Sequence, residues 1–392
     1  MSRMGSSLRL FRVWGIDVRV HWSFVLILVY GAFIYAGHSN PVVGALYGIV
    51  VILLLFVCVL LHEFGHALTA KYFNVNVPNI TLLPIGGVAQ LERMPRQPFQ
   101  EFLIAIAGPA VNFVLTLLLL PVALLVVGLG VESANISSLF TYAQTRMMTP
   151  SLDGLLVYLA ITNLALGLFN LLPAFPMDGG RVLRALLAMA MPYVRATRIA
   201  VMVGRMMAIL LAFLGLGGNI MLLLIAFFVY VGGRGELEAV ESRYVLKDIR
   251  VCQALNADAH QIFTSETIDK AVDLIMTTYQ ADFPVFDLGS NFVGVLTRNR
   301  LVDVLRTHGR EGRVVDIMIP AQEVPVVGAD VTLADVWDRM LEARSRVVAV
   351  KENGRFLGLL TLADISELIQ VVGAAKELED RRAAQRPTKA AL

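Results

Sequence analysis

Two histidines and a glutamate stand close together in the segment Leu60-Leu61-His62-Glu63-Phe64-Gly65-His66. Residues four positions apart lie one turn apart on the same face of an α-helix, so the imidazoles of His62 and His66 can bind a single zinc ion. Glu63 lies on the flank of that face, where its carboxylate can take a proton from a water molecule held by the metal. The H-E-x-x-H spacing therefore indicates a zinc-dependent hydrolytic centre of the metallopeptidase type.

The surroundings of this motif are apolar. It ends a run from Val42 to Leu61 whose length suits the hydrocarbon core of a bilayer, about 30 Å thick. Ionisable residues are costly inside such a run and usually serve a function. H-E-x-x-H also arises by chance on exposed helices of soluble chains, but a chance match would here have to explain three polar side chains at the end of a membrane helix. We interpret the segment as the centre of an intramembrane zinc protease.

The composition divides the chain into two parts. Hydrophobic residues make up 57% of the 392 residues and charged residues only 16%, as in a polytopic membrane protein. The apolar bias is confined to residues 1–235, and beyond them charge returns at the density of a soluble domain. The two cysteines, Cys58 and Cys252, predict no disulfide framework. The net charge of +2 gives no indication of nucleic-acid binding, and none is expected. The N-terminus lacks a short hydrophobic segment with a small-residue cleavage site, so no removed signal peptide is expected.

Six apolar segments are predicted to cross the membrane, after an amphipathic hairpin over residues 8–20. The predicted spans cover about 22–36, 43–61, 101–128, 153–173, 197–214 and 219–232. The arginines that flank them follow the positive-inside bias, and an even number of spans returns the chain to its starting side. We therefore expect a multi-pass protein of the cell membrane with both termini in the cytoplasm. The absence of eukaryotic targeting features indicates a prokaryotic membrane.

The stretch 74–100, between the second and third spans, is strand-like and broken by Gly86 and Gly87. Irregular backbone at membrane depth is tolerated only where protein or water satisfies its polar groups. One use would be an edge strand that pairs with an unwound substrate, and the alternative is a simple Gly-Gly turn. Asn112 is a polar residue within the third span that must face something other than lipid. Gly86, Gly87 and Asn112 are our candidates for substrate binding.

A catalytic zinc ion needs three protein ligands and one open position, so the motif lacks a ligand. The other histidines lie on the outer side, at the start of the first span or in the soluble part. Asp178 lies just beyond the inner end of the fourth span, at the depth of His62 and His66 under the predicted topology. It could instead cap the helix that follows it, but the broken helix and the matching depth favour ligation.

Asn170 lies two helical turns before Asp178. Its amide could hydrogen-bond a tetrahedral oxyanion or the backbone of the substrate. A hydrogen bond between helices would explain this residue equally well.

The membrane part, roughly residues 10–235, resembles the site-2 protease family, the intramembrane zinc metalloproteases of peptidase family M50. The resemblance rests on the following segments: His62-Glu63-Phe64-Gly65-His66, Gly86-Gly87, Gly108-Pro109 with Asn112, and Asn170 followed by Pro176-Met177-Asp178-Gly179-Gly180. It implies one zinc ion per chain, bound by His62, His66 and Asp178, with Glu63 activating water. It also implies cleavage of a transmembrane or membrane-associated protein near the cytosolic face.

The resemblance leaves the substrate open. Relatives process membrane-tethered transcription regulators, anti-sigma factors or signal-peptide remnants, and nothing in this sequence chooses among them. Many bacterial members carry an extracytoplasmic PDZ domain, but the outer loop 129–151 is too short to hold one. A route of substrate selection through a PDZ domain is therefore not expected.

The soluble part contains one pattern twice, over residues 246–306 and 313–370. Each copy has an extended segment, a helix (268–280 and 333–343), two apolar strands and a second helix. The pattern resembles a tandem CBS pair, which in relatives often binds adenine nucleotides such as ATP, ADP or AMP. That resemblance points to Thr361 and Asp364 as contacts for phosphate and ribose.

The first copy departs from this pattern. It has Thr297, but Arg300 occupies the position of the aspartate, which puts ribose binding in doubt; Arg298 or Arg300 could still pair with a phosphate. The alternative is a pair that is purely structural or forms a homodimer.

The sequence therefore predicts a six-span α-helical membrane domain followed by an α/β tandem CBS domain. The expected boundaries are 1–235 for the protease domain, 236–245 for a linker, 246–306 and 307–373 for the CBS repeats, and 374–392 for a charged tail. The predicted function is regulated intramembrane proteolysis, with the CBS pair as a nucleotide-dependent regulator. A CBS-regulated transporter and a membrane scaffold that binds clients without cutting them are the alternatives.

Overall fold

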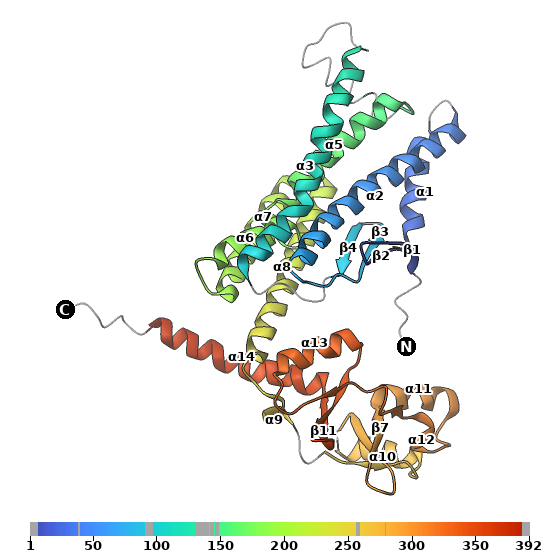
Figure 1. Cartoon of the computed structure of the whole chain (residues 1–392), viewed down its shortest axis with the longest axis vertical. Helices are drawn as coiled ribbons and strands as arrows, with labels where there is room; N and C mark the ends of the chain where they lie inside the picture. Colours follow the sequence, from blue (N-terminus) through green and yellow to red (C-terminus); the bar gives the residue numbers. More distant parts are fainter. Residues whose placement is uncertain are drawn as a thin grey trace, which may run out of the picture. The chain divides into compact units, whose positions relative to one another are not determined.

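The computed structural model describes residues 7–37, 40–90, 97–129, 141, 145, 149–255, 259–278 and 280–385. Figure 1 shows the order of the elements along the chain. The chain divides into two compact units, Met1–Leu237 and Glu238–Leu392. The predicted linker, residues 236–245, lies within a continuous helix, α8, and the predicted 374–392 tail continues helix α14 as far as Gln385.

The first unit consists of helices and one small sheet. Its helices are α1 (Phe24–Tyr35), α2 (Pro41–Tyr72), α3 (Pro98–Leu129), α5 (Leu152–Asn170), α6 (Asp178–Ala188), α7 (Tyr193–Gly215) and α8 (Ile220–Leu246), of which the last ends in the second unit. In Figure 1, α3 runs beside both α2 and α5. The helix α2 continues without interruption from the predicted second span through the H-E-x-x-H motif, which places both histidines on one rigid element.

Five of the described helices are long and apolar enough to cross a membrane, namely α2, α3, α5, α7 and α8. They correspond to the second through sixth predicted spans. The first predicted span corresponds to α1, an apolar helix of 12 residues. At 1.5 Å per residue α1 is about 18 Å long, which is shorter than the hydrocarbon core. The prediction of six spans is thus supported for five.

A four-stranded sheet packs against the second half of α2. Its strands are β1 (Ser7–Val13), β2 (Ile16–His21), β3 (Asn79–Leu83) and β4 (Gly86–Gln90), in the order β1-β2-β3-β4. The pairs β1–β2 and β3–β4 are antiparallel hairpins, and β2 and β3 are parallel. The predicted hairpin over residues 8–20 and the predicted strand within 74–100 are therefore confirmed.

Strand alternation explains how this sheet attaches to the helix. Ile16 and Val18 point to the same face of β2, are fully buried, and pack with Phe64 and Ala67 of α2. The strand β4 forms one edge of the sheet. Gly86 opens β4 with φ 138°, a conformation that side chains with a Cβ rarely adopt. The motif-bearing end of α2 is thus covered by a sheet whose edge strand begins at the Gly86-Gly87 pair.

The second unit contains the two predicted repeats, each with the order strand, helix, two antiparallel strands, helix. The elements of the first are β5 (Ile262–Phe263), α10 (Ile268–Thr278), β6 (Asp282–Phe286), β7 (Phe292–Thr297) and α11 (Arg298–His308). Those of the second are β9 (Val326–Val327), α13 (Leu333–Ala343), β10 (Val347–Glu352), β11 (Arg355–Thr361) and α14 (Leu362–Gln385). The short elements α9 (Val251–Ala254), α12 (Val314–Ile317) and β8 (Ile319–Pro320) precede or connect them.

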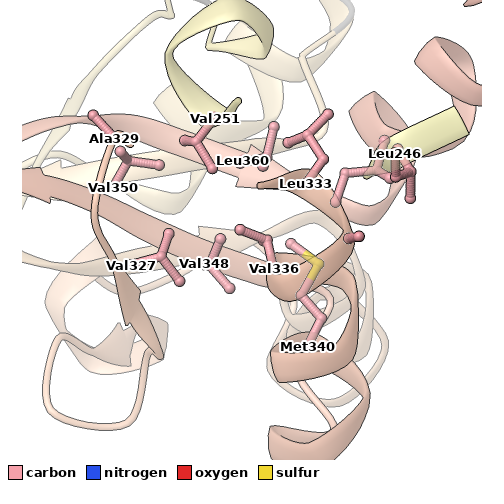
Figure 2. Close-up of a cluster of buried hydrophobic side chains, with 12 residues drawn as sticks. Leu246, Val251, Val327, Ala329, Leu333, Val336, Met340, Val348, Val350 and Leu360 are labelled. Carbon is pink, nitrogen blue, oxygen red and sulfur yellow. The ribbon is translucent and has the colours of Figure 1, made fainter. Parts of the chain in front are cut away.

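Each repeat has its own hydrophobic core. In the second, Val348 of β10 faces Val336 of α13, and Val350 lies beside Ala329, as Figure 2 shows. The two repeats also pack on each other, because the rings of Phe292 and Phe356 stack with centroids 4.3 Å apart. The predicted duplication is therefore a pair of α/β modules joined within one unit.

Candidate metal centre

Three side chains from two distant parts of the chain converge beside the H-E-x-x-H helix. The Nε2 atoms of His62 and His66 are 3.1 Å apart, and the Oδ2 atom of Asp178 lies 3.3 Å from the first and 3.1 Å from the second. Both histidines are buried, and the side chain of Asp178 is 13% exposed. Asp178 is the first residue of α6, whereas both histidines lie on α2.

The separations of these donor atoms fit a single zinc ion. Imidazole nitrogen and carboxylate oxygen bind zinc at about 2.0–2.2 Å in tetrahedral geometry, so two ligand atoms of one ion lie roughly 3.3–3.6 Å apart. The three measured separations, 3.1–3.3 Å, are close to that value. Two neutral imidazoles and one carboxylate are also a common donor set of catalytic zinc sites, which leave the fourth position open.

Asp178 does not cap its helix. The N-cap position of α6 belongs to Met177, and no side chain caps this end of the helix. The carboxylate of Asp178 instead contacts the two imidazoles. Asp178 therefore joins the motif histidines rather than the backbone of its own helix.

A backbone carbonyl orients one of the imidazoles. The Nδ1 atom of His66 lies 2.7 Å from the carbonyl oxygen of Ile104 on α3. Because a carbonyl oxygen can only accept, His66 carries its proton on Nδ1 and donates it, which leaves the lone pair of Nε2 directed at His62 and Asp178. Such outer contacts fix the tautomer and the ring orientation of metal-binding histidines.

Gly108 on α3 gives the two imidazoles their space. A Cβ atom at this position would lie 2.5 Å from Cε1 of His66 and 2.8 Å from Cε1 of His62, and closer still to Nε2 of His66. Any side chain here would therefore displace both rings. The Gly108-Pro109 segment thus contributes to the site through the absence of a side chain.

Gly108→Ala should lower the affinity for zinc by at least about tenfold, because displaced ligand rings lose the geometry on which metal affinity depends. The measurement is competition for zinc between the purified protein and a chromogenic chelator. Gly233→Ala is the matched control, since the added methyl group would meet only Cγ1 of Val201, at 3.6 Å. Unchanged zinc affinity in the Gly108→Ala protein would show that the rings do not need this space.

Glu63 is held by the edge strand of the sheet. Its Oε2 atom accepts a hydrogen bond of 3.1 Å from the backbone N–H of Ala89 on β4. Ala89 lies opposite Ile80 in the hairpin, and its N–H points away from β3 toward α2. A Cβ atom on Gly87 would lie 2.6 Å from Cγ of Glu63, so a glycine is needed for this approach. The structure therefore places the Gly86-Gly87 strand directly beside the carboxylate of the motif.

The two candidate asparagines lie close to the site in sequence but do not join the three converging side chains. Asn170 ends α5 and forms no hydrogen bond to His62, His66 or Asp178 in the described part of the chain. Asn112 lies one turn after Gly108 on α3 and is 1% exposed. Among the described residues its Oδ1 atom has no hydrogen-bond partner.

A buried charge network fixes α6, the helix that begins with Asp178. Arg184 of α6 donates to Glu101 of α3 over 2.8 Å from Nε, and to Glu236 of α8 over 2.5 Å from Nη1. The side chains of Arg184 and Glu101 are each 1% exposed. Removing one partner of such a buried pair usually costs about 3–5 kcal/mol, because the other charge stays buried alone. The network therefore holds α6 firmly against α3, which also carries Gly108.

Sequence reasoning missed this network. The positive-inside bias places Arg184 on the inner side of the membrane but predicts no partner for it. Its guanidinium lies in the protein interior, over the rings of Phe175 and Tyr193. The signal was present: Glu101 and Arg184 are ionisable residues in or beside apolar segments, where a charge usually has a partner. The carbonyl of Ile104 and the N–H of Ala89 gave no such signal, since every residue has these groups.

In the CBS pair, Thr361 and Asp364 bond to each other. The Oγ1 atom of Thr361 donates to Oδ2 of Asp364 over 2.7 Å, and the N–H of Asp364 donates back to that Oγ1 atom over 3.2 Å. Thr297 caps α11 by accepting from the N–H of Arg300, and Nε of Arg300 contacts the carbonyl of Ile317 at 3.4 Å. Thr297 and Thr361 each end a strand and are followed directly by a helix, α11 and α14.

An acidic group of the first repeat lies near the second repeat. Burial raises the pKa of the Asp282 carboxyl, and the charge of Asp364 raises it further, against the opposing effects of the Arg298 N–H and of Arg346. The carboxylates of Asp282 and Asp364, one from each repeat, therefore lie close enough to influence each other's charge.

Comparisons with known proteins identify two family models in this chain. Residues 50–214 match the model of peptidase family M50, and residues 314–371 match the model of the CBS domain. A zinc metalloprotease of Methanocaldococcus jannaschii is 32% identical over 380 residues, which cover 96% of this chain and 100% of that protein. Rip3 of Mycobacterium tuberculosis is 30% identical over 392 residues, 95% of each chain.

Among solved structures, the site-2 protease from Methanocaldococcus jannaschii is 38% identical and covers 59% of this chain and 95% of its own, with a TM-score of 0.41.

Proposed function

The chain belongs to peptidase family M50, the site-2 protease family of membrane zinc metalloproteases, and we propose that it cleaves transmembrane or membrane-associated proteins near the cytosolic face. The observation that carries this proposal is the convergence of His62, His66 and Asp178 beside Glu63. The first three side chains offer zinc one ligand atom each. Glu63 lies next to these three side chains and can act as the base, because the other three would be occupied as zinc ligands.

In the proposed mechanism, His62, His66 and Asp178 would hold the zinc ion. When bound, zinc polarises a substrate carbonyl and makes water a nucleophile at neutral pH. Glu63 accepts the proton of the attacking water and returns it to the leaving amine. Asn170 would donate its side-chain N–H to the oxyanion or to the substrate backbone, and Asn112 would contact the substrate.

The substrate would bind as an added strand on β4. Among the described residues β4 is the last strand of the sheet, so no further strand pairs with its outer edge. On that edge the N–H of Ala89 is bonded to Glu63, whereas the other backbone groups of the edge would pair with the peptide. A peptide that pairs there would lie next to Glu63. Its helix must first unwind, because the carbonyls of an intact helix are engaged in hydrogen bonds. Gly87 would keep this edge clear of side chains.

Removal of the metal tests the assignment. The purified protein should cleave fusion proteins that carry a single transmembrane segment interrupted by Gly-Pro. A chelator should abolish this cleavage, and about one equivalent of zinc per chain should restore it. Cleavage that persists after zinc has been removed completely would refute the proposed mechanism.

The CBS pair would regulate this activity by binding an adenine nucleotide near Thr361 and Asp364. The support is the match of the second repeat to the CBS model and the helix-starting position of these residues. Regulation requires that the nucleotide bind two states of the protein with different affinity. Titration with ATP, ADP and AMP should change the cleavage rate, and a rate unaffected by all three would exclude regulation by these nucleotides.

Both termini would lie in the cytoplasm of a prokaryotic cell. A green fluorescent protein fused to the C-terminus should then be fluorescent, and an alkaline phosphatase fused there should be inactive. The reverse pattern would contradict this orientation.

A further inference from the structure

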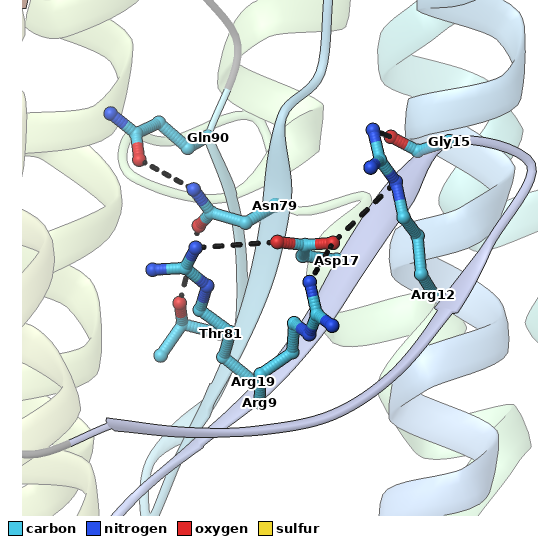
Figure 3. Close-up of polar contacts among 8 residues, drawn as sticks. All are labelled: Arg9, Arg12, Gly15, Asp17, Arg19, Asn79, Thr81 and Gln90. Atoms are coloured by element: carbon cyan, nitrogen blue, oxygen red, sulfur yellow. Dashed lines mark hydrogen bonds and ion pairs between the residues drawn. The ribbon is translucent and has the colours of Figure 1, made fainter.

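Three arginines surround one aspartate on the face of the sheet that is turned away from α2. Figure 3 shows this arginine cluster, which consists of Arg9, Arg12 and Arg19 around Asp17. Their nitrogen atoms lie 3.8, 3.6 and 3.3 Å from the carboxylate oxygens of Asp17. The arginine side chains are 62%, 63% and 41% exposed, whereas that of Asp17 is only 16% exposed.

The register of the strands brings these residues together. Arg12 lies opposite Asp17, and Arg9 lies opposite Arg19, so all four share one face of the β1–β2 hairpin. Like charges directly opposite each other destabilise a sheet. Three guanidinium charges against one carboxylate leave an excess of two positive charges. The local sequence therefore maintains a repulsion that an added anion would relieve.

Among the described residues, most N–H donors of the arginine cluster form no hydrogen bond. The exceptions are bonds of 3.3 Å from Arg12 to the carbonyl of Gly15 and from Arg19 to Asp17. A guanidinium has five N–H donors, and charge-assisted hydrogen bonds to carboxylates are usually about 2.7–2.9 Å long. All three contacts to Asp17 are longer than that, and Nε of Arg19 is buried without a hydrogen-bond partner among the described residues. Lys71 adds a further cation at the turn of the hairpin, where it donates to the carbonyl of Trp14. The donors fit a phosphate, whose oxygens match the fork of an arginine.

Large apolar side chains lie exposed on the same hairpin. Leu8 is 69% exposed, Leu10 51% and Trp14 64%, and Trp22, just after β2, is 59% exposed. Exposed leucines and tryptophans next to arginines are typical of a protein surface at the boundary between lipid headgroups and acyl chains. The apolar helix α1 begins at Phe24, directly after this hairpin. A phospholipid combines an anionic phosphodiester with hydrocarbon chains, so it matches both the arginines and the exposed apolar side chains.

We propose that the arginine cluster binds the headgroup of an anionic phospholipid at the outer β1 edge of the sheet. The acyl chains would pass round that edge to Leu8, which lies opposite Val20 on the other face. They would also reach Trp14, which contacts Phe64 of α2. A free phosphate or an acidic peptide would use the arginines but not the apolar side chains. The lipid would anchor the sheet that ends in β4, the strand that holds Glu63. The bound lipid would then influence the position of the Glu63 carboxylate, because the sheet is continuous from β1 to β4.

The test uses the full-length protein in a neutral detergent and native mass spectrometry to count bound lipids. Phosphatidylglycerol and phosphatidylcholine with identical acyl chains are titrated separately, and inorganic phosphate forms a third arm. The wild-type protein should bind phosphatidylglycerol about tenfold more tightly than phosphatidylcholine, or better, because each basic residue near an anionic headgroup adds affinity. The triple variant Arg9→Gln, Arg12→Gln, Arg19→Gln should lose this preference.

Two further variants separate the cluster from general effects of charge and folding. Arg306→Gln, Arg313→Gln, Arg355→Gln removes three exposed arginines of the second unit and should keep the preference. Arg9→Lys, Arg12→Lys, Arg19→Lys keeps the charge without the forked donors and should retain part of it.

Three outcomes would overturn the proposal. They are equal binding of both lipids by the wild-type protein, an undiminished preference in the glutamine triple variant, and tighter binding of inorganic phosphate than of phosphatidylglycerol. None of these measurements depends on proteolysis, so they stand apart from the proposed enzymatic function.

Discussion

Glu63→Gln should reduce the rate of peptide cleavage by about 10²–10⁴-fold, the usual contribution of a positioned general base. The amide keeps the size of the carboxylate, and its oxygen can still accept the N–H of Ala89. What it cannot do is take up a proton. Because Glu63 is not one of the three converging ligands, zinc should remain bound. The measurements are the cleavage rate of a transmembrane fusion substrate and the zinc content of the same preparation.

The control is Glu342→Gln, an exposed glutamate of the second unit, which should cleave at the wild-type rate. A Glu63→Gln protein with wild-type activity and normal zinc content would reject the role of Glu63 as the base. Loss of zinc together with activity would instead mean that Glu63 contributes to metal binding.

Asp178→Ala should reduce zinc from about one ion per chain to a small fraction, with a loss of affinity above roughly 100-fold. Even the outer partners of metal ligands contribute about 10–100-fold, and Asp178 is a direct ligand in the proposed site. The substitution leaves two imidazoles, which are too few for a stable catalytic zinc site. This experiment needs no substrate, since the zinc content of the purified protein is measured directly.

Asp269→Ala, which removes a carboxylate that is 58% exposed, serves as the control and should retain zinc. Zinc retained without loss by the Asp178→Ala protein would leave the third ligand unassigned. Zinc absent from both the folded wild-type protein and the variant would favour a transporter or a scaffold over a protease.

The sequence alone determined the features that depend on neighbours along the chain. The four-residue spacing of His62 and His66 already places both on one helical face, because a helix fixes positions one turn apart. Hydropathy located the five helices of spanning length, since each must bury its own backbone hydrogen bonds in lipid. Alternating side chains predicted the β1–β2 hairpin, and the duplicated pattern predicted the α/β repeats.

Other features depend on residues far apart in the chain, and only the tertiary structure decided them. Asp178 follows His66 by 112 residues; the sequence favoured it as a ligand but left a helix cap as the alternative. The bond between Glu63 and Ala89 and the space beside Gly108 involve backbone groups or the lack of a side chain, which carry no recognisable pattern. The charge bias along the chain assigned Arg184 to one side of the membrane, and the structure located its carboxylate partners on α3 and α8.

The physical reason is the difference between local and long-range interactions. Periodicity and hydropathy follow from the geometry of a single element in its solvent. Which side chains meet in the interior depends instead on how several elements pack, and that packing is a property of the whole unit. The sequence thus identified the chemistry of the H-E-x-x-H helix, and the packing of α3, α6 and the sheet around α2 determined which groups complete it.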